Sequence, residues 1–307
     1  MAKKGDTQNT DAGNYIIGAG ITGLLAGYLL KDYKIISREE NIGGQLKATF
    51  QLGPRFVRYN KDFVKILKKL KIKFLVKHVK IGYFNGTEIL DEPTEEMKLK
   101  YAQYTRKHNA LQQSFMNDGL NKMKILKFDM DLFIDKLKRS LKDRITNSNA
   151  TDIDLNKKII MLDNDTYLNY DKIVSTIHYS DFCNLVGEKD NFTYGDIFFF
   201  LVDNNVIPYD SKHYAFIYII SDDIPFNRVT KIKIGSVLEA PRPLTKQQME
   251  QFGVKQYYIL KNCKLKGEYK IIPIQNVTFL GRYATLENET RIHNIVERIA
   301  EIKKGEN

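Results

Sequence analysis

A glycine-rich turn between a short apolar segment and an apolar helix is the feature that most limits how this chain folds. Residues 15–17 are predicted as a buried strand, residues 24–30 as a helix and residues 34–36 as a second strand. Residues 18–23, GAGITG, follow the pattern G-x-G-x-x-G: the first glycine permits a tight turn, the second lets the backbone approach a pyrophosphate, and the third allows close helix packing. The helix N-terminus adds free amides and a positive dipole, so the unit predicts dinucleotide binding. The predicted binding residues are Gly18, Gly20, Ile21, Thr22 and Gly23.

Composition narrows the class of protein. A chain of 307 residues suits one compact two-lobed α/β enzyme, and its two cysteines, Cys183 and Cys263, form no C-x-x-C pair that would suggest a disulfide framework or zinc site. The longest apolar runs, residues 197–202 and 214–220, are far shorter than the roughly 18 to 20 residues that cross a bilayer. We therefore expect no membrane span and a cytoplasmic, reducing location. The sequence makes no prediction about the oligomeric state.

The formal charge of +11 favours anionic partners, which include a nucleotide-containing substrate and nucleic acid. Biased base composition in a genome is the alternative explanation for this charge. In addition, lysine runs usually form solvated faces and bind no partner.

Changes in hydrophobic period divide the chain. Residues from about 94 to 141 lack Gly and Pro except at Gly119 and carry helical patterning, whereas residues 157–177 suit a hairpin with its turn at 163–165. We predict a disordered tail (1–13), a Rossmann-like dinucleotide-binding domain (14–90, 146–190 and 270–307), a helical insertion (91–145) and a smaller β-rich, mixed α+β substrate lobe (191–269).

FAD rather than NAD is indicated by residues 37–44, SREENIGG, which resemble the second strand end and paired glycines of glutathione-reductase-type flavoproteins. In that pattern the ribose-binding acid falls at Ser37, and Glu39 or Glu40 are possible substitutes. The resemblance implies that the cofactor is also contacted by Arg38, Gly43, Gly44 and Gln45.

Four further segments resemble landmarks of the UDP-galactopyranose mutase, protoporphyrinogen-oxidase and amine-oxidase flavoproteins. Residues 52–60 resemble the G-P-H-x-x-H segment, 171–177 the D-x-V-[IV]-S-T strand, 224–229 the V-P-Y-T-R-I segment and 279–285 the F-L-G-R-x-A flavin loop. Their order spans nearly the whole chain.

The resemblance implies roles for individual residues. Gly53 and Pro54 would lie near the cofactor, Gly281 and Arg282 against the flavin, and the turn of Thr290, Arg291 and Ile292 would point amides at the flavin C2 carbonyl. Arg228 would face the substrate side of the ring, and its alternative is a structural ion pair with Asp222 or Asp223.

Arg55 and Arg58 replace both histidines of the mutase segment. Arginine is a fixed cation that cannot act as a general acid or base near neutral pH, so these residues suit an anionic substrate. We predict Arg55, Arg58 and Arg228 as catalytic-site residues, with Arg55 also contacting the cofactor. The alternative is that Arg55 and Arg58 hold the FAD pyrophosphate or a surface carboxylate. The five histidines show no metal-ligand spacing.

Three functions follow from these patterns. The first is an FAD-dependent, amine-oxidase-like oxidoreductase that oxidises a C–N or C–O bond in an anionic substrate. The second is a non-redox, mutase-like flavoenzyme acting on a UDP-sugar. The third is a flavoenzyme acting on nucleic acid, with lysine-rich residues 61–80 and the predicted insertion as its contact surface.

Overall fold

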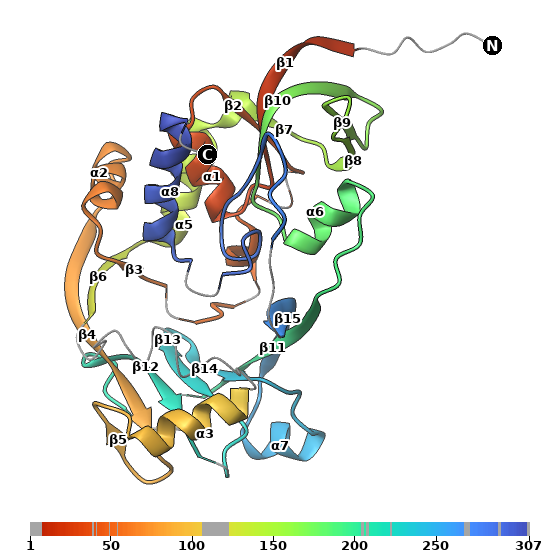
Figure 1. Cartoon of the computed structure of the whole chain (residues 1–307). Coiled ribbons are helices and arrows are strands. Elements are labelled where there is room, and N and C mark those ends of the chain that lie inside the picture. The colour runs from red at the N-terminus through yellow and green to blue at the C-terminus, as the bar shows by residue number, and fades with distance from the viewer. Residues whose placement is uncertain are drawn as a thin grey trace.

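The computed structural model describes residues 8–38, 40, 42–48, 50–53, 55–105, 123–203, 206, 209–221, 223–266, 271–287 and 290–305. Within these ranges it contains two mixed sheets, which lie one above the other in Figure 1. The predicted cofactor residue Pro54, the alternative acid Glu39 and the predicted ion-pair partner Asp222 lie outside the described residues.

The first sheet is built on the predicted βαβ unit. Its order is β7 (Ile145–Thr146), β2 (Tyr33–Ile36), β1 (Gln8–Ile17), β10 (Tyr167–Ser175), β9 (Ile159–Leu162) and β8 (Ala150–Asp154), with β16 (Val277–Phe279) also paired with β10. Strands β7, β2, β1, β10 and β16 are parallel, whereas β8, β9 and β10 form an antiparallel meander. The hairpin predicted around residues 163–165 is confirmed as the β9–β10 connection.

Both faces of this sheet are buried, which explains the unbroken apolar runs of its strands. In β1, Ile16 belongs to one core while its neighbours Tyr15 and Ile17 belong to the core on the opposite face. The first face is covered by α1 (Ile21–Leu29), α2 (Lys61–Lys69), α5 (Met130–Ser140) and α8 (Ile292–Lys304), and the second by the meander and α6 (Tyr179–Leu185). Fully burying side chains such as Leu24 or Phe63 contributes about 1.5–3 kcal/mol each.

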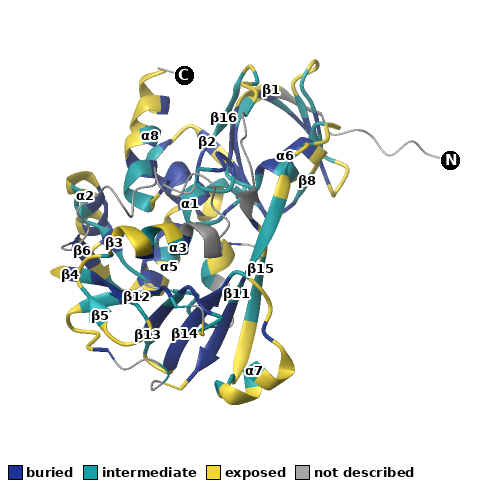
Figure 2. Ribbon diagram, turned by 60° about the horizontal axis from the view of Figure 1, so that its bottom comes forward, coloured by how far each residue is buried: buried dark blue, intermediate teal, exposed yellow. Residues whose placement is uncertain are grey.

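The second sheet runs in the order β15 (Gln256–Lys266), β11 (Thr193–Val202), β14 (Gly235–Ala240), β13 (Arg228–Ile232), β12 (Tyr214–Ile219), β4 (Phe74–Phe84), β6 (Met123–Phe128) and β3 (Val57–Arg58), with β5 (Ile89–Leu90) paired with β4. Helices α3 (Glu95–Thr105) and α7 (Lys246–Gln251) accompany it. Figure 2 shows β14 buried and α7 exposed at the outer end. The predicted α/β class with a second, β-rich part is thus observed.

Several predicted boundaries need correction. Residues 8–13, predicted as tail, extend β1 and pair with β10, because backbone hydrogen bonds to a neighbouring strand do not require apolar side chains. Strands β3, β4 and β5, assigned by sequence to the nucleotide domain, belong to the second sheet.

The predicted helical insertion 91–145 is also wrong in part. Its residues 123–128 form β6, which pairs with β3 and β4 and buries Met123, Ile125 and Leu126. Helix α5, from the same segment, packs on α1 instead of forming a separate unit. No helix in the described part of the chain is long and apolar enough to span a membrane.

Candidate cofactor and substrate site

A cavity of about 1000 Å³ lies where the two sheets face each other. One part of its wall comes from the loops after β1, β2 and β10, and another from β3, β4, β12 and β13. This volume is at the upper end of small-molecule sites, so it suits a large cofactor together with a substrate.

The first glycine turn has the geometry that its sequence predicts. Gly18 has a φ of +99°, and an added Cβ would lie 2.8 Å from Thr176 Oγ1. A Cβ on Gly23 would lie 1.9 Å from the Gly18 carbonyl oxygen, so this glycine lets α1 pack against the turn. At Gly20 a Cβ would meet nothing within 4 Å, and this residue lines the cavity. The space beside Gly20 is where the motif places a pyrophosphate.

The second glycine pair lies directly against the first turn. Gly43 and Gly20 form a bridge, and the Gly43 amide donates to the Ala19 carbonyl at 2.8 Å. A Cβ on Gly44, whose φ is +56°, would lie 3.1 Å from the Gly20 Cα. Gln45 follows in the same turn, and both glycines and Gln45 line the cavity.

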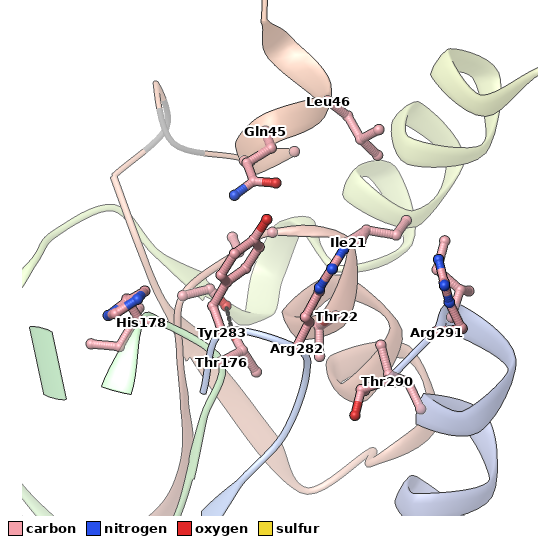
Figure 3. A pocket seen from close by; sticks show the side chains of 18 of the residues that line it. Ile21, Thr22, Gln45, Leu46, Thr176, His178, Arg282, Tyr283, Thr290 and Arg291 are labelled. Atoms are coloured by element: carbon pink, nitrogen blue, oxygen red, sulfur yellow. Dashed lines mark hydrogen bonds between the residues drawn. The ribbon is translucent and has the colours of Figure 1, made fainter. Parts of the chain in front are cut away.

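The C-terminal segment lies against the first turn and lines the cavity with Arg282, Tyr283, Thr290 and Arg291, which Figure 3 labels. Gly281, with a φ of +98°, fits against Thr22 because a Cβ would lie 2.9 Å from that side chain. Thr290, Arg291 and Ile292 line the cavity at the N-terminus of α8, whose first turn contains no acidic residue. Two helix N-termini, of α1 and α8, therefore border one cavity, and both favour a negatively charged ligand.

Of the residues predicted at the end of β2, some line the cavity and others do not. Ser37 lines the cavity, but its hydroxyl donates to the Arg38 carbonyl at 3.3 Å. Arg38 is not among the lining residues: its Nε and a terminal nitrogen both donate to Asp163, at 3.0 and 2.7 Å. Hydrogen bonds from Ser148 and Arg38 lower the pKa of Asp163 to about 2. Glu40 lines the cavity three residues beyond Ser37.

The structure corrects the prediction for Arg55, which does not line the cavity. Its guanidinium donates to both carboxylate oxygens of Asp131, at 2.9 and 3.2 Å, and to the Leu46 carbonyl at 3.0 Å. Asp131 lies in the first turn of α5, so Arg55 ties the glycine-pair turn to that helix. Gly53 likewise lies outside the lining, where a Cβ would come within 3.3 Å of Arg228.

The cavity wall is cationic. Arg58 and Arg228 come from the second sheet, whereas Arg282 follows β16 and Arg291 precedes α8. Burial, followed by the charge of Arg282, lowers the pKa of Arg291, and Arg58 and Arg228 add to that effect. The Arg291 guanidinium is thus close enough to the other three arginines to be affected by their charges.

Among the described residues Arg228 forms an ion pair with Glu239, a partner that the sequence did not suggest, whereas Asp222 lies outside those residues. Burial works to lower the pKa of Arg228, and the Glu239 carboxylate is the main influence that raises it. Arg228 also lies over the Phe216 ring, 5.4 Å from its centroid.

Some lining residues were not predicted as site residues. Thr176 donates its hydroxyl to the carbonyls of Ile17 and Gly18, at 3.0 and 3.1 Å, which fixes the first turn. His293 follows the predicted Ile292; burial, with the charges of Arg58 and Arg291, lowers its pKa to about 4. Phe216 and Tyr218 supply an aromatic wall. Aromatic residues in a strand can build a substrate cage but are more often core residues, so the sequence did not single these two out.

Comparison with known proteins supports this architecture. No protein-family model and no curated protein sequence matches the chain. Among solved structures, reduced UDP-galactopyranose mutase superposes with a TM-score of 0.62 and 12% identity, over 96% of this chain and 94% of that chain. A putrescine oxidase triple mutant gives 0.60 and 11%, over 95% and 99%. A fatty acid isomerase from P. acnes gives 0.62 and 12%, over 96% and 98%.

The chain shares the fold of these three solved structures. This agrees with the resemblance found in the sequence motifs, although the identities of 11–12% show the fold alone.

The residues present fit the cofactor that this fold implies, FAD. The open space at Gly20 would take the pyrophosphate, beside Gly43 and Gly44. The loop after β2, with Ser37 and Glu40, offers hydroxyl and carboxylate groups for the adenosine end. The cavity then continues past Arg282 to the N-terminus of α8, which suits the flavin end.

Proposed function

We propose that this chain is an FAD-dependent enzyme that oxidises a C–N or C–O bond in an anionic substrate. The observation that carries the proposal is the group of four arginines, Arg58, Arg228, Arg282 and Arg291, in a cavity that also contains the dinucleotide-binding turn. Guanidinium groups bind carboxylates and phosphates through paired hydrogen bonds, which fixes the orientation of a substrate as well as its charge.

The balance of charge in the cavity wall supports an anionic ligand. The basic lining residues are these four arginines and Lys261, whereas the acidic ones are Glu40 and Asp181. His293 adds no charge near neutral pH, because its pKa is about 4. The wall therefore carries an excess of positive charge that an anionic substrate would balance.

The residues of the chain would bind and orient the substrate, while bound FAD would supply the hydride-accepting chemistry. Phe216 and Tyr218 offer an apolar surface that excludes water beside the arginines. Burial raises the pKa of Tyr218, so its phenol stays neutral and acts as a hydrogen-bonding group.

Anaerobic reduction of the FAD-loaded protein tests this function. We expect bleaching of the flavin absorbance by an amine or alcohol that carries a carboxylate or phosphate, and not by the uncharged analogue of the same compound. Equal reduction by both members of such pairs would refute the anionic substrate, and no reduction by a broad panel of carbon donors would refute the oxidoreductase.

A non-redox, mutase-like reaction on a UDP-sugar is the second candidate. It is favoured by the same arginines, which suit a diphosphate, and by the similarity to UDP-galactopyranose mutase. This reaction would proceed only after dithionite reduction and without net consumption of electrons. Absence of any flavin spectral change with UDP would exclude it.

Nucleic-acid binding stays a prediction from the charge of +11. It requires affinity for DNA or RNA that falls steeply with salt.

A further inference from the structure

Arg228 and Glu239 occupy directly opposed positions in neighbouring strands. They are cross-strand partners in the antiparallel pair β13–β14, and their side chains form an ion pair. Both are largely buried, with 22% of the Arg228 side chain and 11% of the Glu239 side chain exposed. Of the two, Arg228 lines the cavity.

Glu239 is itself held by a second buried residue. The Asn227 backbone amide donates to the Glu239 carbonyl at 2.8 Å, and Asn227 Nδ2 donates to Glu239 Oε1 at 3.4 Å. Asn227 is 1% exposed, and its side chain also contacts the hydroxyl of buried Tyr101, on α3. The network thus runs from α3 through Asn227 and Glu239 to Arg228.

This arrangement fixes one side of the Arg228 guanidinium. The guanidinium group has five N–H donors, and a single carboxylate accepts from only some of them. The Phe216 ring covers one face of the group, with its centroid 5.4 Å from Arg228 Cζ. A cationic side chain constrained in this way loses little further conformational freedom when it binds a planar oxyanion.

We propose that Glu239 is a positioning residue, which orients Arg228 in the cavity so that its remaining donors receive the acidic group of the substrate. The inference rests on the proposed function, because it assumes an anionic ligand. Removal of the Glu239 charge has two opposite effects. It makes the cavity more positive, which strengthens the attraction of any anion, and it releases Arg228, which weakens binding that depends on orientation.

The sign of the change in affinity therefore tests the proposal. The probe is benzoate, measured by the flavin difference spectrum of the FAD-loaded protein, with uncharged benzamide as its partner. For Glu239→Gln we expect at least a tenfold rise in the benzoate dissociation constant, little change for benzamide, and recovery in Glu239→Asp. The control Asp203→Asn, which breaks an exposed ion pair with Lys255, should leave both constants unchanged.

Unchanged or tighter benzoate binding by Glu239→Gln, in protein that retains FAD, would overturn the positioning role and leave the proposed function intact. Absence of benzoate and phosphate binding by the wild-type protein would overturn the proposed function and this inference together. If Glu239→Gln does not fold, the double variant Arg228→Met, Glu239→Leu removes both buried charges. It should retain FAD and lose benzoate binding, and retained benzoate binding would refute the proposal.

Discussion

At the scale of single residues, the three glycines of one motif have different physical roles. Gly20 has a φ of −63° and open space around it, whereas Gly23 faces the Gly18 carbonyl oxygen. This separation of a residue facing the open cavity from a packing contact follows the different roles that the motif gives to its second and third glycines.

Gly20→Ala and Gly23→Ala should consequently fail in different ways. Gly20→Ala should change the free energy of unfolding of the apoprotein by no more than about 1 kcal/mol. It should weaken FAD binding at least tenfold, since the added methyl group enters the space for the ligand. Gly23→Ala should destabilise the apoprotein by about 1–3 kcal/mol or more. Urea denaturation and FAD titration measure both, and equal loss of stability in the two variants would contradict this assignment.

His293 predicts a pH effect on stability. Its pKa in the folded protein, about 4, lies below its ordinary value of 6.5, so the unfolded chain binds a proton more readily. Stability of the apoprotein should fall as pH drops from about 6.5 towards 4, because protonation then favours the unfolded state. Measured by thermal denaturation, His293→Gln should lose less stability over this interval than the wild type.

At the scale of elements, the cavity depends on contacts that hold its turns. The turn η2 (Gly44–Lys47) supplies Gln45 and Leu46 to the cavity wall, and Arg55 joins it to α5 through Asp131. An arginine that the motif placed at the reacting centre instead has a supporting role.

Variants of this contact distinguish support from catalysis. Asp131→Asn should cost less than about 1 kcal/mol of stability, since the Asp131 carboxylate is largely exposed. Arg55→Met, which also loses the bond to the Leu46 carbonyl, should raise the FAD dissociation constant several-fold and leave turnover at saturating FAD near the wild-type value. If Arg55→Met retains FAD fully but loses turnover, Arg55 acts at the reacting centre and the supporting role is wrong.

At the scale of the whole molecule, the cavity wall is shared by both sheets, so a ligand that fills it links them. FAD at about 100 times its dissociation constant should stabilise the fold by about 2.7 kcal/mol. For a chain of 307 residues, that corresponds to a rise in melting temperature of roughly 4 °C. ADP, at the same multiple of its own dissociation constant, would occupy only the adenosine end of the cavity.

Limited proteolysis separates the two ligands. FAD should protect sites in both sheets, and ADP only those near the first sheet. Equal protection by ADP would show that the second sheet does not contact the cofactor.

The sequence by itself determined the βαβ unit, the placement of its glycines and the flavoprotein frame, because these depend on neighbouring residues and on the backbone freedom of glycine. Only the tertiary structure decided that Arg55 lies outside the cavity lining, that Arg228 pairs with Glu239 and that β3, β4 and β6 belong to the second sheet. Residues far apart in the sequence form these contacts, and a charged side chain in a turn or strand has several partners within reach. The glycine turn needs little beyond its own residues to be recognised, whereas the function of each arginine depends on which carboxylate the fold brings beside it.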